Sequence, residues 1–149
     1  MAIEIRMLRA GDEATLARVA DEVFDNPVDP DLTRQFLADP RHHIAVAIDD
    51  GLVVGFASGL DYVHPDKPAE LWINEVGVAP SHQRQGLGRR VMKALFAEGR
   101  AKGCGTAWVL TDRSNTAARA LYIALDGDEG VDEGPADAIV GYDFDLENG

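Results

Sequence analysis

Apolar residues alternate with polar ones in several short segments of the chain, and such alternation is typical of strands. Period-two patterns, or short β-branched runs between turn residues, predict strands at residues 3–8, 43–48, 52–60, 70–79, 106–111 and 139–144. The turn Asp49-Asp50-Gly51 joins the second and third of these strands as a hairpin.

Apolar residues spaced at i, i+3 and i+4 predict four helices, at residues 12–26, 31–38, 87–102 and 115–125. The first depends on the spacing of Leu16, Val19, Ala20, Val23 and Phe24, and it must stop before Pro27. The second is expected to pack through Leu32 and Phe36. The fourth is expected to be capped by Ser114.

These elements follow one another in the order β-α-α-β-β-β-α-β-α-β, without a linker or an internal repeat. A chain of 149 residues fits one domain of ordinary size. We therefore expect a single α/β domain over residues 1–149, with a mixed central β-sheet flanked by helices.

The overall composition narrows the classes of partner. A net charge of −12 argues against nucleic acid, which needs a basic face. Cys104 is the single cysteine, and the first ten residues lack the apolar run of a signal peptide, so we expect a cytoplasmic protein without disulfides. No apolar stretch approaches the roughly 20 residues that span a bilayer, so no membrane association is expected.

Charge is unevenly distributed along the chain. Residues 126–149 contain nine acids and no Lys or Arg, whereas residues 82–102 contain six Lys or Arg and one acid, Glu98. Such a chain suits an enzyme that binds a phosphate-bearing cofactor in one place and a cationic acceptor in another. Acid-rich ends also simply aid solubility, and charge alone does not separate the two interpretations.

A glycine-rich turn lies where the strand at 70–79 gives way to the helix at 87–102. Gly86 and Gly88 let the backbone approach a ligand, and the first helical turn presents unpaired N–H groups, as anion sites require. Arg84 and Arg89 add guanidinium groups suited to phosphate. The turn is neither a Walker P-loop nor a Rossmann fingerprint, because the residues that complete those motifs are missing.

The segment "VGVAPSHQRQGLGRR" resembles the acetyl-coenzyme A binding motif of the GCN5-related N-acetyltransferase (GNAT) superfamily, with Val76, Val78, Gln83, Gly86 and Gly88 at the motif positions. Thirty-two residues after Gln83 begins "NTAARALY", which resembles the family's Asn-x-x-Ala-x-x-Leu-Tyr helix. Both motifs and the element order match the family over essentially the whole chain.

The resemblance implies acetyl-coenzyme A (acetyl-CoA) as cosubstrate. No metal site is expected, because His42 and His43 are adjacent on a predicted strand and therefore point to opposite faces. The pyrophosphate is expected on the glycine turn and the pantetheine arm along the strand end that precedes it. The residues expected to bind the cofactor are Val76, Gly77, Val78, Gln83, Arg84, Gln85, Gly86, Leu87, Gly88, Arg89, Arg90, Asn115 and Ala118.

Acetyl transfer to an amine needs a base and a proton donor, and each has a candidate. Tyr122 matches the family position whose hydroxyl lies near the coenzyme A sulfur. Glu75 precedes the cofactor strand end in an apolar segment, where a partly desolvated carboxylate can take the proton of the amine and attract an ammonium group. Each has a structural alternative: Tyr122 as a packing residue, Glu75 as a solvent-facing acid. Cys104 has no His nearby in sequence, so an acyl-cysteine route is not expected.

Within the superfamily the chain resembles the aminoglycoside 3-N-acetyltransferases, in "INEVGVA", "WVLTD", "AARALY" and the acidic end "YDFDLE". That resemblance implies an aminoglycoside as the small cationic acceptor, bound by Glu75 together with Asp143, Asp145 and Glu147. A homodimer is expected from the family. The segment 126–137 departs from the family pattern and leaves the exact acceptor open.

Two alternatives remain open at the level of sequence. One is a GNAT acetyltransferase for another small amine or a peptide N-terminus. The other is a noncatalytic acyl-CoA-binding module, which would need the glycine turn but neither Glu75 nor Tyr122.

Overall fold

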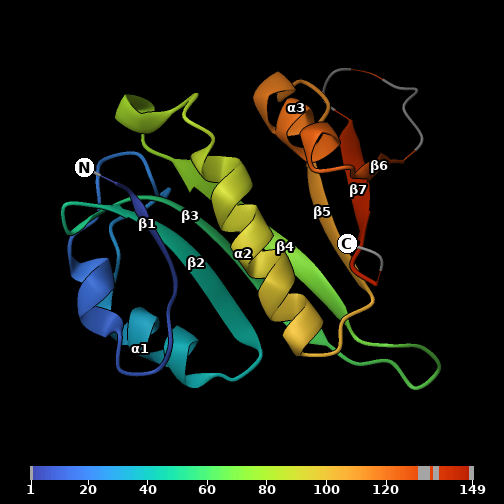
Figure 1. The fold of residues 1–149 in the computed structure, drawn as a ribbon, viewed down its shortest axis with the longest axis horizontal. Helices are drawn as coiled ribbons and strands as arrows, with labels where there is room; N and C mark the ends of the chain where they lie inside the picture. The colour runs from blue at the N-terminus through green and yellow to red at the C-terminus, as the bar shows by residue number, and fades with distance from the viewer. Residues whose placement is uncertain (1, 131–134, 136–137, 148–149) are drawn as a thin grey trace.

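The computed structural model describes residues 2–130, 135 and 138–147, which form one mixed β-sheet flanked by helices (Figure 1). Within these residues the sheet has seven strands in the order β1-β2-β3-β4-β5-β7-β6. The strands are β1 (Glu4–Met7), β2 (His42–Asp49), β3 (Leu52–Tyr62), β4 (Glu70–Val78), β5 (Thr106–Asp112), β6 (Asp128–Glu129) and β7 (Ile139–Asp145). The helices are α1 (Pro30–Ala38), α2 (Leu87–Ala101) and α3 (Thr116–Ala124), with the short 3-10 turns η1 (Glu13–Ala17) and η2 (Pro80–His82). The expected α/β class and mixed sheet are confirmed.

Neighbouring strands in this sheet are antiparallel, except for β4 and β5. These two run parallel, because the chain returns from the end of β4 to the start of β5 through helix α2. The β2–β3 hairpin turns at Asp50 and Gly51, both with positive φ, as a two-residue turn requires. The hairpin predicted from the sequence is confirmed.

Helix α2 covers one face of β1 to β4, and small side chains let it approach. Register places Ala45 beside Ala57 and Ala47 beside Gly55, on the face where Val78 meets the start of α2. The opposite face carries Ile44, Phe56, Ser58 and Glu75. It is covered by the segment from η1 to α1, where the Phe24 ring stacks on Phe56 at a centroid distance of 4.1 Å.

The predicted helix over residues 12–26 is wrong. Only Glu13–Ala17 forms a 3-10 turn, and the chain then becomes extended, with a parallel bridge between Val19 and Val53. Val53 N donates to Arg18 O and Ala20 N to Val53 O, both at 2.9 Å. These bonds to the sheet replace the intrahelical ones, while Leu16 and Val23 are still buried.

Two smaller expectations also need correction. Helix α1 forms where predicted, but Leu32 is exposed and Thr33 and Leu37 are its buried residues. Helix α3 is capped by Asn115, whose Oδ1 accepts from Ala118 N at 3.0 Å, and not by Ser114. The segment 126–137, expected to be a loop, contains strand β6, while residues 131–134 and 136–137 lie outside the described part of the chain.

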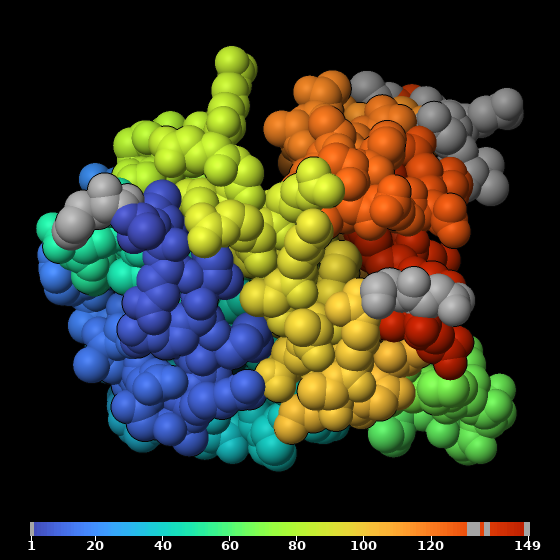
Figure 2. All heavy atoms as spheres, in the orientation of Figure 1, coloured from blue at the N-terminus to red at the C-terminus, as the bar shows by residue number. Residues whose placement is uncertain are grey.

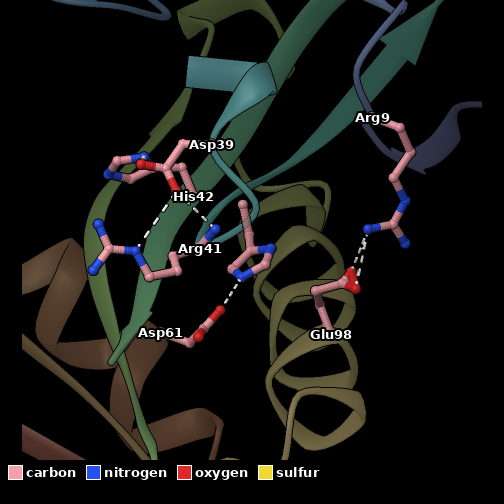
Figure 3. A network of polar contacts seen from close by, with 7 residues as sticks. Arg9, Asp39, Arg41, His42, Asp61 and Glu98 are labelled. Carbon is pink, nitrogen blue, oxygen red and sulfur yellow. Dashed lines mark hydrogen bonds and ion pairs between the residues drawn. The ribbon is translucent and has the colours of Figure 1, made fainter. Parts of the chain in front are cut away.

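A network of polar contacts closes the end of the sheet near the last turns of α2 (Figure 3). Arg9 Nη1 binds both carboxylate oxygens of the buried Glu98, at 2.7 and 3.0 Å. His43, buried in β2, contacts Asp61 of β3, Nε2 to Oδ2, at 2.5 Å. Because the glycine turn lies at the other end of α2, these contacts stabilise the fold away from it.

None of the helices in the described residues is long and apolar enough to cross a membrane.

Candidate active site

In the described residues, strands β4 and β5 are paired only over the first three residues of each. The parallel ladder joins Glu70, Leu71 and Trp72 to the first three residues of β5 and goes no further. From Ile73 onward, β4 pairs with β3 on one side and has no ladder to β5 on the other. Figure 1 shows the two strands diverging beneath α2 and α3. The backbone of the second half of β4, including Val76, Gly77 and Val78, therefore presents an unpaired edge that an extended ligand can complete.

The glycine turn leads from this edge into α2. Gly86 is the N-cap residue with a φ of 76°, and Arg84 also has a positive φ, of 64°. The first intrahelical bond runs from Arg90 N to Gly86 O, so the amides of Leu87, Gly88 and Arg89 precede the helical ladder. These amides and the positive end of the helix dipole suit an anion.

Some side chains around the turn hydrogen-bond to the backbone of neighbouring segments, and others are exposed to solvent. Gln83 Nε2 donates to Val78 O at 3.2 Å and ties the turn to β4. Leu87 is buried, so only its amide can reach a ligand. Arg90 Nη2 donates to Ile3 O at 3.1 Å, toward the N-terminal segment, whereas Arg84, Gln85 and Arg89 are exposed beside the turn.

Helix α3 closes the other side of this region. A Cβ added to Gly88 would lie 3.2 Å from Leu121 Cδ2, so the two helices approach closely at the first turn of α2. Figure 2 shows a notch in the surface between the yellow-green turn and the orange α3. The notch lies over the diverging strands, and its donors and free strand edge fit a phosphate-bearing pantetheine ligand such as coenzyme A.

Tyr122 lies on α3 with its ring in the core, against Tyr142 and Phe144 at centroid distances of 5.3 and 6.2 Å. Its hydroxyl bonds to none of the described residues, yet it is not among the polar atoms sealed from solvent. Burial raises the pKa of Tyr122 to about 12. The hydroxyl therefore stays protonated at neutral pH and keeps a proton to donate.

Glu75 lies on the other face of the sheet and lines a pocket of about 350 Å³. The expected partial desolvation is wrong, because Glu75 is exposed to solvent. The walls of the pocket come from the segment between η1 and α1, from α1 itself and from β2 to β4. All of its charged lining residues are acidic: Asp25, Asp29 and Glu75.

A second pocket, of about 680 Å³, continues around the same segment. It shares Asp25 with the first and adds Glu13, Asp21 and Glu22, again without a Lys, Arg or His in its lining. The two pockets share the lining residues 24–28, and together they are called the groove here. Glu75 lies at the β4 side of the groove, and the charged residues that line it are acidic, which attracts cations.

The acids expected at the end of the chain lie on a more distant surface. Asp143, Asp145 and Glu147 are exposed, while Tyr142, Phe144 and Leu146 are buried, as the alternation predicted. Asp143 lies opposite Trp108 in the register of β5 and β7. The Trp108 ring stacks on the Trp72 ring at a centroid distance of 4.9 Å. Asp145 lies about 7 Å further along β7, away from the divergence, and Glu147 further still. Of the three, only Asp143 approaches the opening between β4 and β5.

Several residues of the groove were not expected from the sequence, notably Phe24, Asp25, Asn26 and Ser58. The run "DEVFDNPVDP" did contain a signal: acids next to two prolines indicate an acidic turn. This acidic turn was not predicted, because a helix was expected over residues 12–26.

Other reactive side chains are already occupied or inert. His82 contacts Ser81 and Asp49 through its two ring nitrogens, both at 2.7 Å. Cys104 is buried, and burial raises its pKa to about 11, which leaves the thiol a poor nucleophile. Among the residues described, no group of three or more His, Cys, Asp or Glu is placed to hold a metal ion.

Comparison with known proteins agrees with this geometry. Residues 12–125 match the model of the acetyltransferase (GNAT) family. The N-alpha-acetyltransferase RimI of Mycobacterium tuberculosis is 32% identical over 124 residues, which cover 80% of this chain and 75% of that protein.

Solved structures share the fold at low identity. An aminoglycoside acetyltransferase from an uncultured soil metagenomic sample, in complex with sisomicin, superposes with a TM-score of 0.72 at 19% identity, over 89% of this chain and 94% of that one. The yncA protein of Salmonella typhimurium, with its cofactor acetyl-CoA, gives a TM-score of 0.68 at 24% identity, over 98% and 95% of the two chains. The chain belongs to the acetyltransferase (GNAT) family.

Proposed function

We propose that this GNAT acetyltransferase acetylates a primary amine of a multiply cationic small molecule, namely the 3-amino group of an aminoglycoside. One observation carries the proposal: among the described residues, every charged side chain that lines the groove beside Glu75 is a carboxylate. Such a groove favours an acceptor with several ammonium groups over a neutral or anionic one.

On the cofactor side, the amides of Gln85, Gly86, Gly88 and Arg89 bind the pyrophosphate, and Arg84 and Arg89 add charge. Leu87 contributes through its backbone. Gln83 holds the turn against β4, and Asn115 and Ala118 form the opposing start of α3. Arg90 acts at longer range, because its guanidinium is bonded to Ile3 O. When bound, acetyl-CoA supplies the acetyl group as a thioester.

The residues divide the chemistry between the two faces of the sheet. Glu75 accepts a proton from the ammonium group, directly or through water, and frees the lone pair that attacks the thioester carbonyl. An amide of Val76 or Val78 donates to the carbonyl oxygen as negative charge develops there. The new C–N bond forms as the C–S bond breaks, and Tyr122 gives its proton to the departing sulfur. The nitrogen of the new amide then releases its second proton through water, which reprotonates Tyr122.

The surface around Trp72 and Asp143 extends the acceptor site. Asp143 pairs with a second ammonium group, and the exposed Trp72 offers a flat apolar surface to a sugar ring. Asp145 and Glu147 attract the ligand at longer distance. A partner subunit that contributes to this surface would make the enzyme a homodimer.

A peptide N-terminus is the second candidate acceptor. Similarity to RimI, an N-alpha-acetyltransferase, favours it, and the open groove can hold an extended chain. A noncatalytic role has less support, because a module that only binds acyl-CoA needs the glycine turn but neither Tyr122 nor Glu75.

Release of free thiol from acetyl-CoA, followed with a chromogenic thiol reagent, tests the proposal. The acceptors are gentamicin, sisomicin, kanamycin, spermidine and a panel of peptides with free N-termini. We expect turnover of the 2-deoxystreptamine compounds, with the acetylated position assigned by NMR of the product. Turnover of peptides alone would replace the aminoglycoside proposal with the second candidate, and tight acetyl-CoA binding without turnover would contradict both.

A further inference from the structure

Ser58 is a buried serine in the middle of β3 whose hydroxyl has no hydrogen-bond partner in the described part of the chain. Its side chain is 7% exposed and lines the same pocket as Glu75. It makes no hydrogen bond to any described residue, and its oxygen is not among the atoms sealed from solvent. Buried hydroxyls in proteins are normally bonded. This one is open to the pocket, where a ligand can bond to it.

Register places Ser58 directly across from Glu75. The two are Cα partners in the antiparallel pair of β3 and β4, so their side chains lie on one face with Cβ atoms about 5 Å apart. Ile44 flanks Ser58 on β2. A hydroxyl and a carboxylate therefore stand side by side on the pocket floor.

A β-bulge next to this pair fixes its position. The register shifts between Ser58 and Gly59, and Asn74 is the extra residue on β4. Gly59 has no room for a side chain, because a Cβ there would lie 2.3 Å from Trp72 O. The bulge turns Asn74 and Glu75 toward the pocket together, since both line it.

The chemistry of an attacking amine matches this pair of groups. A neutral primary amine has two N–H donors and one lone pair. If Ser58 Oγ accepts one N–H and the carbonyl oxygen of the protonated Glu75 carboxyl accepts the other, the lone pair is left to point away from both, toward the acetyl group. A secondary amine that has given up its proton has one N–H and cannot satisfy both acceptors.

We propose that Ser58 binds the nitrogen of the acceptor together with Glu75, orients its lone pair and makes the enzyme selective for primary amines. The inference rests on the proposed function, because it assigns a role within the acceptor site. Ser58 carries no signal in the sequence, because a serine within an apolar strand belongs to no motif.

The test compares wild type with Ser58→Ala and with Ser58→Cys, which keeps the volume but bonds weakly. For each we measure kcat and KM with a primary-amine acceptor and with its N-methyl derivative, and the Kd of acetyl-CoA by calorimetry. Both variants should lose about five- to tenfold in kcat/KM for the primary amine and less for the N-methyl derivative, so that selectivity falls. The Kd of acetyl-CoA should not change.

Thr33→Val is the matched control, because Thr33 is equally buried in this pocket but its hydroxyl donates to Asp29 O at 2.9 Å. It should leave the selectivity ratio unchanged, whatever it does to stability. Ser58→Thr, which retains the hydroxyl, should keep the ratio of wild type and separates hydrogen bonding from a folding defect.

Wild-type kcat/KM and selectivity in both Ser58→Ala and Ser58→Cys would overturn the inference while leaving the proposed function intact. Absence of acetyl transfer to any amine by wild type would overturn the proposed function first, and the inference with it.

Discussion

Tyr122 combines a buried ring with a hydroxyl that bonds to none of the residues described by the structure, and one substitution can separate the two. Tyr122→Phe removes the oxygen but keeps the ring contacts with Tyr142 and Phe144. We expect kcat to fall about 10²-fold, because the proton donor is lost. The Kd of acetyl-CoA, measured by calorimetry, should stay near that of wild type. Full activity of the variant would leave Tyr122 with a packing role alone.

The raised pKa of Tyr122 also predicts a pH dependence. Burial holds it at about 12, above the ordinary value of 10.0, so the folded protein binds this proton more tightly than the unfolded chain. The corresponding stability is fully present below pH 10 and is lost as pH rises through 12. Urea unfolding between pH 8 and 11 should therefore show a decline above about pH 10 that is steeper in wild type than in Tyr122→Phe. The variant keeps the smaller decline due to Cys104, Tyr62 and Tyr142, whose pKa values burial also raises. Parallel curves for the two proteins would contradict the assignment.

Glu75 is exposed, so its role as a base depends on its position beside the acceptor rather than on desolvation. Glu75→Gln should lower kcat/KM by about 10-fold or more, and most at pH values where the acceptor amine is protonated. The measurement is a pH–rate profile for both proteins. A rise in KM with unchanged kcat and the same profile would show that Glu75 attracts the acceptor without taking its proton.

At the scale of elements, the bulge between β3 and β4 is the feature that aims Glu75 and Ser58 into one pocket. Gly59→Ala should lower the free energy of unfolding by roughly 1–3 kcal/mol, because the new Cβ cannot fit against the backbone of Trp72. Gly105→Ala is the control, since its Cβ would meet the Glu147 side chain at an ordinary 3.4 Å. Urea denaturation measures both, and equal stability of the two variants would contradict this account.

Elements whose hydrogen bonds are local could be predicted from the sequence, and those whose bonds are to distant residues could not. Helix α2 and the β2–β3 hairpin carry their own periodicity and turn residues, and both were correctly predicted. Residues 18–26 have helical spacing, but Arg18 and Ala20 bond to Val53 across the fold. No local signal reveals those bonds, the bulge at Asn74 or the divergence of β4 from β5.

At the scale of the whole molecule, the acids that lie together in the sequence are not the ones that the fold places beside Glu75. The acidic end of the chain was expected to bind the acceptor, yet Asp145 and Glu147 lie away from the strand divergence. The acids that share a pocket with Glu75 are instead Asp25 and Asp29, from the segment before α1, which the fold brings against β4. The cofactor turn could be predicted because its residues are contiguous, whereas the groove is assembled from four separate segments.

That arrangement predicts how salt affects the reaction. From about 0.01 M to about 0.15 M salt the screening length falls from about 30 Å to about 8 Å, so the carboxylates of the groove stop acting together on an approaching cation. KM for a polycationic acceptor should rise several-fold, and KM for a monoamine much less. Asp25→Asn should raise KM for the polycation by about two- to fivefold and reduce its salt dependence. Asp50→Asn makes the same charge change in the hairpin turn, outside the lining of both pockets, at a backbone φ of 50° that asparagine tolerates. Equal effects of the two substitutions would mean that total charge, rather than the groove, attracts the acceptor.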